Sequence, residues 1–179
     1  MKQYPETINI ILKRKSVRSF TGASVAHEDL ELILRAGMAA PSAVNMQPWN
    51  FVVVTNRSTL DELAAGLPYA KMLDKAGAAI IVCAVPQLAV HQSPEYAVLD
   101  CAAATQNILL AAESLGLGAV WTAAYPRKER MEHVRKVLNI PAGVIPLNVI
   151  PIGVPTGEDQ PKDKWDEKKI HWERWGLGR

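Results

Sequence analysis

Apolar and polar residues alternate along the chain with two different periods, which predict a mixture of helices and strands. Apolar positions with helical spacing predict helices over residues 6–13, 27–40, 58–65, 95–115 and 127–138. Short apolar runs predict buried strands over residues 50–55, 78–85, 119–122 and 144–152. Prolines at 146 and 151 are expected to interrupt the last strand. This order of elements indicates an α/β or α+β fold.

The helix predicted over residues 95–115 is apolar around nearly its whole circumference, and many of its residues are small. A helix of this composition is typically buried on every side. Because about 30 Å of helix is difficult to bury on all sides within 179 residues, we expect a second subunit to cover part of it. The alternative is a central helix that the sheet and helices of its own chain surround.

Composition is typical of a globular protein, with 49% apolar and 21% charged residues. The 20 basic and 18 acidic residues give a formal net charge of +2, which offers no general argument for binding nucleic acid. The sequence contains no internal repeat and no low-complexity linker. We therefore expect residues 1–179 to form a single domain.

The two cysteines, Cys83 and Cys101, lie in apolar runs and form neither a CxxC motif nor a disulfide framework. This usage is typical of small core residues in a reducing compartment. The first residues carry no apolar run of the signal-peptide type, and no window of about 20 residues is free of polar groups. We therefore expect a cytoplasmic protein with no membrane partner.

A short basic segment follows the first predicted helix and reads Arg14-Lys15-Ser16-Val17-Arg18. In an extended chain alternate residues point the same way, so Arg14, Ser16 and Arg18 would share one side. Two guanidinium groups and a hydroxyl are suitable donors for a phosphate. Near the other end of the chain, Lys162 and Lys164 alternate in the same way and are candidates to complete such a site. Solvated basic turns are the alternative for both segments.

A second polar segment joins the second predicted helix to the first strand, and it reads Ala40-Pro41-Ser42-Ala43-Val44-Asn45-Met46-Gln47-Pro48-Trp49. Its prolines restrict the backbone, while Ser42, Asn45 and Gln47 offer donors and acceptors at short spacing. Such a loop suits the polar edge of a flat heterocycle. The alternative is a helix-to-strand turn shaped by its prolines.

Several common motifs are absent or misplaced. Gly116-Leu117-Gly118 follows a helix and precedes a strand, whereas dinucleotide-binding glycines follow a strand and open a helix. The four histidines lack the spacing of paired ligands, so we expect no metal site. No Gly-x-Ser-x-Gly sequence of the kind that carries a nucleophilic serine occurs.

Four segments, taken in order, resemble the FMN-dependent nitroreductase family. They are Arg14-x-Ser16-x-Arg18; Ala40-Pro41-Ser42-x-x-Asn45-x-Gln47-Pro48-Trp49; Asp100 with Gln106-Asn107 running into Gly116-Leu117-Gly118-x-x-Trp121; and Ile152-Gly153-x-Pro155 followed by Lys162-x-Lys164. The resemblance covers nearly the whole chain. It implies an α+β fold, a nitroreductase-like three-layer α-β-α sandwich, which forms an intertwined homodimer with FMN sites at the subunit interface.

The resemblance also implies which residues bind FMN. Those of the basic segments would hold its phosphate: Arg14, Lys15, Ser16, Arg18, Lys162 and Lys164. Those of the polar segment would line the flavin ring of the other subunit: Pro41, Ser42, Asn45 and Gln47. A third group would lie near the ring: Trp121, Thr122 and Ala123. The family's usual C-terminal arginine is a lysine at position 164 here, which weakens the argument for paired donors at that position.

The activity implied by the resemblance is transfer of hydride from NAD(P)H through flavin N5 to a nitroaromatic or quinone-like acceptor. In such an enzyme the flavin carries the redox chemistry, so no catalytic side chain is expected. One alternative is another flavin reaction on this fold, such as reductive dehalogenation or dehydrogenation. Two others are a flavin carrier or sensor without turnover, and a phosphate- or nucleotide-binding module without flavin.

Overall fold

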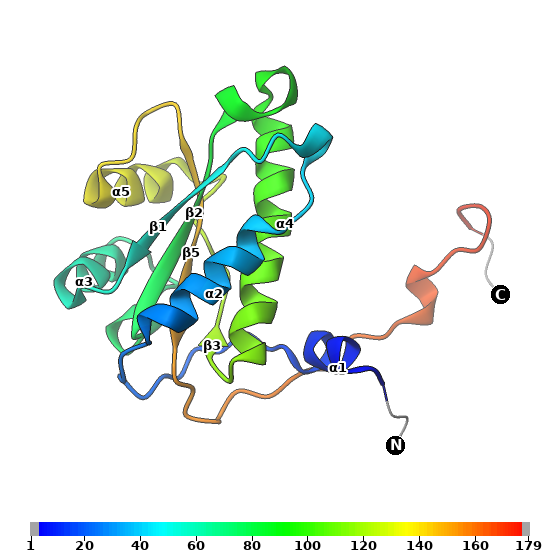
Figure 1. Cartoon of the computed structure of the whole chain (residues 1–179), viewed down its shortest axis with the longest axis horizontal. Coiled ribbons are helices and arrows are strands. Elements are labelled where there is room, and N and C mark those ends of the chain that lie inside the picture. The colour runs from blue at the N-terminus through cyan, green and yellow to red at the C-terminus, as the bar shows by residue number, and fades with distance from the viewer. Residues whose placement is uncertain (1–3, 177–179) are drawn as a thin grey trace.

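A five-stranded antiparallel sheet is the middle layer of the computed structural model, which describes residues 4–176 (Figure 1). Its strands are β1 (Trp49–Val54), β2 (Ala78–Ala84), β3 (Gly118–Ala119), β4 (Thr122–Ala123) and β5 (Ile145–Gly153). They follow the order β1-β2-β5-β3, and β4 also pairs with β5. Residues 1–3 and 177–179 of the predicted single domain lie outside the described residues.

Helices cover both faces of this sheet (Figure 1). The helices on one face are α2 (His27–Met38) and α4 (Pro94–Ser114), and those on the other are α3 (Arg57–Ala65) and α5 (Lys128–Leu138). A further helix, α1 (Glu6–Lys13), lies outside the three layers and contacts α4. Short 3-10 turns, which were not predicted, are η1 (Ala43–Asn45), η2 (Lys71–Asp74), η3 (Pro86–Leu88), η4 (Val90–Gln92) and η5 (Glu167–Lys169). The predicted α+β class and its three layers are confirmed.

Both faces of β2 are buried, which explains why the sequence of this strand is one uninterrupted apolar run. Ile80 and Val82 belong to the core cluster formed with α2 and α4, whereas Ala79 and Ile81 belong to the cluster formed with α3 and α5. All residues of β2 are buried. A strand that is covered on both faces has no polar side, so its sequence shows no alternation.

Strand β5 runs unbroken through both of its prolines, contrary to the expected interruption. Pro146 lies beside a shift in the register between β5 and β2. Proline lacks the N–H group of a regular strand residue, and a sheet tolerates one where its register is irregular. An irregularity in pairing thus replaces the predicted break.

The strand predicted over residues 119–122 is in fact two short strands. β3 ends with Ala119 opposite Ile152, and β4 begins with Thr122 opposite Val149. The gap between β3 and β4 lies opposite Pro151, the residue before Ile152. Proline has no N–H group to donate to a neighbouring strand. The pairing is therefore broken in the short partner strands rather than in β5.

Helix α4 is buried along one side and open along another. Ala104 and Ile108 have no exposed surface, whereas 66% of Leu99 is exposed. Within residues 4–176, one side of this helix is therefore uncovered. A second subunit could cover it only if it were open in this way. Among residues 4–176, no helix combines the length and the apolar character needed to cross a membrane.

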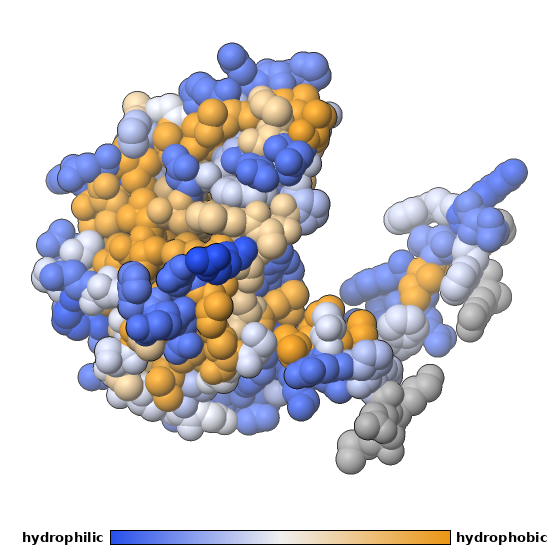
Figure 2. All heavy atoms as spheres, viewed as in Figure 1, coloured by the Kyte–Doolittle hydropathy of each residue, from blue (hydrophilic) through white to orange (hydrophobic). Residues whose placement is uncertain are grey.

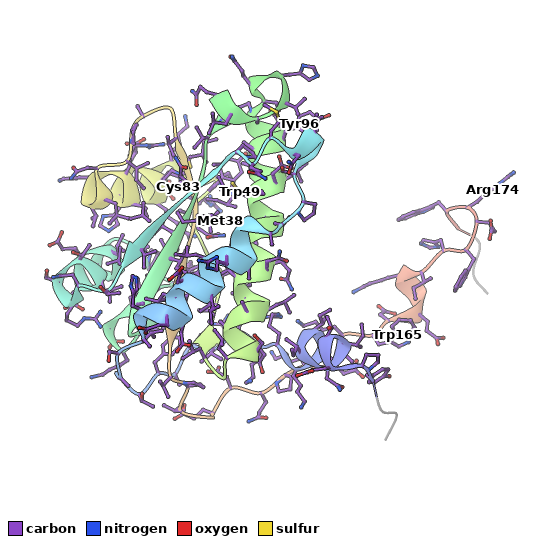
Figure 3. All side chains as sticks on the ribbon, in the orientation of Figure 1. Met38, Trp49, Cys83, Tyr96, Trp165 and Arg174 are labelled. Carbon is purple, nitrogen blue, oxygen red and sulfur yellow. The ribbon has the colours of Figure 1, made fainter. Side chains whose placement is uncertain are left out.

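The C-terminal residues 156–176, which we call the arm, extend away from the three layers (Figure 1). Trp165 is largely exposed, Trp172 is half-exposed, and 90% of Trp175 is exposed. Figure 2 shows apolar residues on α1 and in the arm, both of which project from the body. Figure 3 likewise places Trp165 and Arg174 far from the core side chain of Trp49. Much of this apolar surface stays exposed among the residues that the structure describes.

Candidate functional site

The basic segment that follows α1 lies beside the edge strand β3. Val17 N donates to Ala119 O at 3.0 Å, and the Val17 side chain is buried against Gly118. A Cβ atom at position 118 would lie 2.5 Å from Val17 Cγ1, so this close approach requires glycine. Because successive residues of an extended chain face opposite sides, burying Val17 turns its neighbours Ser16 and Arg18 outward.

The C-terminal segment contacts the basic segment where the arm begins. Phe20 forms an antiparallel bridge with Pro155. Asp159 Oδ2 then accepts the backbone N–H groups of Arg18 at 2.8 Å and Ser19 at 3.2 Å. One carboxylate thus joins two parts of the chain that lie 141 positions apart.

Together the two segments surround a cavity of about 440 Å³, which we call the basic cavity. It is lined by all the residues predicted to hold a phosphate: Arg14, Lys15, Ser16, Arg18, Lys162 and Lys164. Glu158 and Asp159 line it as well. Five cationic side chains therefore face two carboxylates, and this excess of positive charge favours an anionic ligand.

Lys15 differs from the other cations of the basic cavity because its side chain already forms an ion pair. Its Nζ lies 3.1 Å from Glu113 Oε1 on α4, and both side chains are partly buried. Within residues 4–176, the side chains of Arg14, Lys162 and Lys164 form no ion pair. Lys15 therefore ties the basic segment to α4, a role that the sequence did not indicate.

The second predicted segment forms a loop between α2 and β1, which we call the polar loop (residues 41–48). Pro41 is exposed where the loop begins. Val44, Asn45 and Gln47 have positive φ angles of 52°, 58° and 52°, which are uncommon for residues other than glycine. Ser42 Oγ accepts the Gln47 N–H at 2.9 Å, and Gln47 Nε2 donates to Asn45 Oδ1 at 3.1 Å. The polar side chains thus hold the shape of their own loop.

The basic cavity and the polar loop lie near opposite ends of α4 (Figure 1). Ala43 N donates to Asp100 Oδ1 at 3.0 Å near one end, whereas Lys15 pairs with Glu113 near the other. The stretch of helix from Asp100 to Glu113 is about 20 Å long at about 1.5 Å per residue. One chain therefore does not bring these two sets of predicted residues together.

The third predicted group lies in and beside β4. Trp121 occupies the gap between β3 and β4 and is partly exposed. Thr122 Oγ1 donates to the backbone of β5 at 2.5 Å. Thr122 and Ala123 also line a small cavity with Tyr69 and Arg130. The Arg130 guanidinium lies 5.2 Å from the centre of the Tyr69 ring and donates to Ala123 O at 3.2 Å.

No role was predicted from the sequence for the carboxylates that position these regions, namely Asp100, Glu113 and Asp159, although Asp100 belongs to one of the four segments of the resemblance. Each one acts through a contact with a residue far away along the chain. A signal did exist for two of them: between residues 76 and 126 the formal charges are only Glu95, Asp100 and Glu113. A carboxylate in so apolar a stretch needs a specific partner.

Both cysteines are core residues, as predicted. Burial raises the pKa of the Cys83 and Cys101 thiols to about 12. Cys101 Sγ lies 3.7 Å from Pro48 O, at the end of the polar loop. Thiols with so high a pKa stay protonated at neutral pH, so neither is a reactive nucleophile in the folded chain.

Comparison with known proteins connects this geometry to a family. The model of the nitroreductase family matches residues 11–67 and 61–154. A protein of Archaeoglobus fulgidus, provisionally named NADH dehydrogenase/NAD(P)H nitroreductase, is 42% identical over 95% of this chain and 99% of its own. A crystal structure from Bacteroides thetaiotaomicron with the same provisional name is 53% identical, covers 97% of this chain and 100% of its own, and has a TM-score of 0.90. A provisionally named nitroreductase of Desulfovibrio desulfuricans, solved in complex with FMN, is 28% identical, covers 96% and 98%, and has a TM-score of 0.81.

Proposed function

The chain belongs to the nitroreductase family, and from this premise we propose that it is an enzyme that uses FMN to transfer electrons from NAD(P)H to a nitroaromatic or quinone-like acceptor. The names of its relatives support the NAD(P)H-dependent activity. The Desulfovibrio desulfuricans structure, which holds FMN, supports the cofactor. Fold alone does not determine function, so the proposal must also be argued from the residues of the site.

The basic cavity is the observation that carries this proposal, because its residues fit the phosphate group of FMN. The guanidinium groups of Arg14 and Arg18 offer paired donors, and Ser16 adds a short hydroxyl donor. Lys162 and Lys164 add charge, although a lysine does not present the planar pair of donors that an arginine does. Asp159 Oδ2 takes backbone N–H groups, so it does not consume the side-chain donors of the cavity.

We assign the flavin ring to the polar loop of a second copy of the chain. The polar loop of the same chain is separated from the basic cavity by about 20 Å of helix. The open side of α4, the apolar residues of α1 and the exposed tryptophans of the arm all need cover. An intertwined homodimer supplies that cover and places two complete sites at its interface, each built from both chains.

The chain's own residues bind and orient the cofactor. Asn45 and Gln47 offer amide donors and acceptors to the polar edge of the ring, and the exposed face of Trp121 offers a flat apolar wall. Donors at the polar edge stabilise the negative charge that a reduced ring carries. When bound, FMN would supply the redox chemistry between NAD(P)H and the acceptor, while these residues would hold and orient its ring.

An absorbance spectrum and a rapid-mixing experiment test this proposal. We expect a yellow dimer with one FMN per chain, which bleaches when it is mixed anaerobically with NADH or NADPH and recovers its colour with a nitroaromatic or a quinone. A chain that binds no FMN contradicts the cofactor. A bound flavin that does not bleach contradicts the enzyme and favours a carrier, and a monomer that binds FMN fully contradicts the shared site.

Steady-state kinetics test the order of events. If one open face of the ring serves both substrates, the oxidised nucleotide must leave before the acceptor stacks. We then expect parallel double-reciprocal lines, with each substrate inhibiting competitively against the other. Intersecting lines would show that both substrates are bound together and would contradict a single shared face.

A further inference from the structure

Asp100 has a buried carboxylate group that accepts a hydrogen bond from the polar loop. Only 7% of the residue is exposed, and its Oδ1 accepts the Ala43 N–H at 3.0 Å. Its Oδ2 is buried and has no hydrogen-bond partner among the residues that the structure describes. A buried carboxylate oxygen without a partner is costly, so Asp100 is not a residue that packing alone would favour at this position.

The conformation that Asp100 supports is itself unfavourable. Val44, Asn45 and Gln47 all adopt the left-handed region of φ, which a β-branched residue such as valine rarely enters. Strained residues of this kind persist when the surrounding structure holds them, and they gather at ligand sites. The polar loop is therefore held in a shape that an unsupported chain would leave.

The two ends of the polar loop are fixed by different groups. At its far end, Pro48 O accepts the Val85 N–H at 2.8 Å, a contact between backbone groups of the sheet region. At its near end, Ala43 is the first residue of η1, and its N–H bonds to the Asp100 side chain. A change of side chain at position 100 therefore releases the near end and leaves the far end fixed.

We propose that Asp100 is a positioning residue for the flavin ring: its carboxylate holds Ala43 so that Ser42, Asn45 and Gln47 keep the strained arrangement that meets the ring. This inference rests on the proposed function, because it assigns the polar loop to the ring. Asp100 touches no substrate or cofactor and acts through the loop backbone. Its effect should consequently appear in ring binding and not in phosphate binding.

Asn107 offers a matched control on the same helix. Its Nδ2 donates to Ala36 O at 2.9 Å and ties α4 to α2, so it makes one side-chain hydrogen bond to the backbone, as Asp100 does. Unlike Asp100, it forms no side-chain hydrogen bond to the polar loop among residues 4–176. Asn107→Ala should therefore lower stability without changing the affinity for flavin.

The test compares FMN and riboflavin binding to the flavin-free dimer by fluorescence quenching. Asp100→Ala should weaken FMN and riboflavin by the same factor, roughly 10-fold, the scale of one lost hydrogen bond to a charged group. Asp100→Asn keeps an oxygen that can accept the Ala43 N–H, so it should stay within about 3-fold of wild type for both ligands. Hydrogen exchange of the flavin-free protein should show faster exchange at Ala43 in Asp100→Ala than in wild type.

Each failure has a separate meaning. Wild-type affinities in Asp100→Ala, a loss confined to FMN, or an equal loss in Asn107→Ala would overturn the positioning role while leaving FMN as the cofactor. If Asp100→Ala does not fold, an Asp100→Asn variant that folds but loses both ligands roughly 10-fold overturns it too, because the retained oxygen should suffice. A wild-type chain that binds neither flavin contradicts the proposed function itself.

Discussion

The basic cavity and the polar loop are built by opposite means, although we assign both to one cofactor. The basic cavity combines segments 141 positions apart, and the side chains of Arg14, Lys162 and Lys164 form no ion pairs within residues 4–176. The polar loop lies within a few consecutive residues, and its polar side chains already bond to one another. We therefore expect the basic cavity to recognise its ligand by charge and the polar loop to recognise its ligand by a fixed shape.

Removing one guanidinium should separate the two regions most clearly. Arg14→Ala or Arg18→Ala should weaken FMN binding by about one to two decades, because a hydrogen bond to a charged group contributes about 1.5–3 kcal/mol. Riboflavin, which has no phosphate, should bind the variants as it binds wild type. Titration of the flavin-free protein with both ligands measures the difference.

A matched arginine elsewhere controls for loss of charge. Arg35 is exposed on α2 and pairs with Glu31 at 2.7 Å, away from the basic cavity. Arg35→Ala should leave both ligands unaffected. Equal weakening of FMN and riboflavin by Arg14→Ala would show that the basic segment does not recognise phosphate.

Complementation between two defective chains tests whether the regions come from different subunits. One chain would carry Arg14→Ala with Arg18→Ala, and the other Asn45→Ala with Gln47→Ala. Each mixed dimer would contain one fully wild-type site and one site with all four changes. With random pairing, co-expression should restore about a quarter of the wild-type number of FMN sites, because half of the dimers of a two-fold assembly are mixed.

Purification through two different tags isolates the mixed dimers, in which flavin content per chain should be about half that of wild type, because one of their two sites is intact. Each defective chain purified alone should hold little flavin. No recovery in the mixed dimer would place the basic cavity and the polar loop of one site in the same chain, and it would contradict the shared site.

Local pattern predicted the elements well, because helices and buried strands leave regular signals. The helix predicted over residues 6–13 coincides with α1, and the apolar run at 78–85 is β2 with one residue fewer. Both candidate regions were also visible, since basic residues and amides stand out beside apolar runs. Periodicity is a local property, so it captures what neighbouring residues decide together.

Contacts between distant residues could not be predicted in this way. Nothing local to Asp159 indicates that it accepts two backbone N–H groups of the basic segment. Likewise, the left-handed conformation of Val44 depends on its surroundings and contradicts the preference of valine. The break between β3 and β4 also follows from a proline on the neighbouring strand. Tertiary structure decides each of these features.

Gly118→Ala should displace the backbone of the basic segment and leave the polar loop intact. A Cβ atom there would lie 2.5 Å from Val17 Cγ1 and 2.8 Å from Val17 Cβ, so the basic segment must shift. We expect a loss of about 1–3 kcal/mol in the free energy of unfolding, the usual cost of overpacking. Urea denaturation of the flavin-free protein measures this change.

Gly143→Ala is the control for this change, because a Cβ atom there first meets Gln87 Nε2, the end of a flexible side chain, at 3.0 Å. Its effect should stay within about 0.5 kcal/mol. Equal stability of Gly118→Ala and wild type would mean that the basic segment is not held as closely against β3 as the structure has it.

Alkylation of the Cys83 and Cys101 thiols should show whether FMN closes the polar loop. Its expected effect is smaller than those of the substitutions above. Cys101 lies 3.7 Å from Pro48 O beneath the loop, whereas Cys83 lies in β2. Burial raises the pKa of both thiols to about 12, from the ordinary 9.0, so below about pH 9 each stays protonated in both states. Above that pH the unfolded chain loses these protons first, and the free energy of unfolding falls as the pH rises toward about 12.

At neutral pH, labelling therefore requires local opening of the structure. Because a ring bound by the polar loop would hold it closed, FMN should slow the alkylation of Cys101 severalfold and that of Cys83 much less. Peptide mass spectrometry after timed exposure to a maleimide distinguishes the two thiols, and Cys101→Ala identifies the signal. If FMN slowed the alkylation of both thiols equally, FMN would stabilise the whole chain. The conformation of the polar loop would then not depend on the flavin ring.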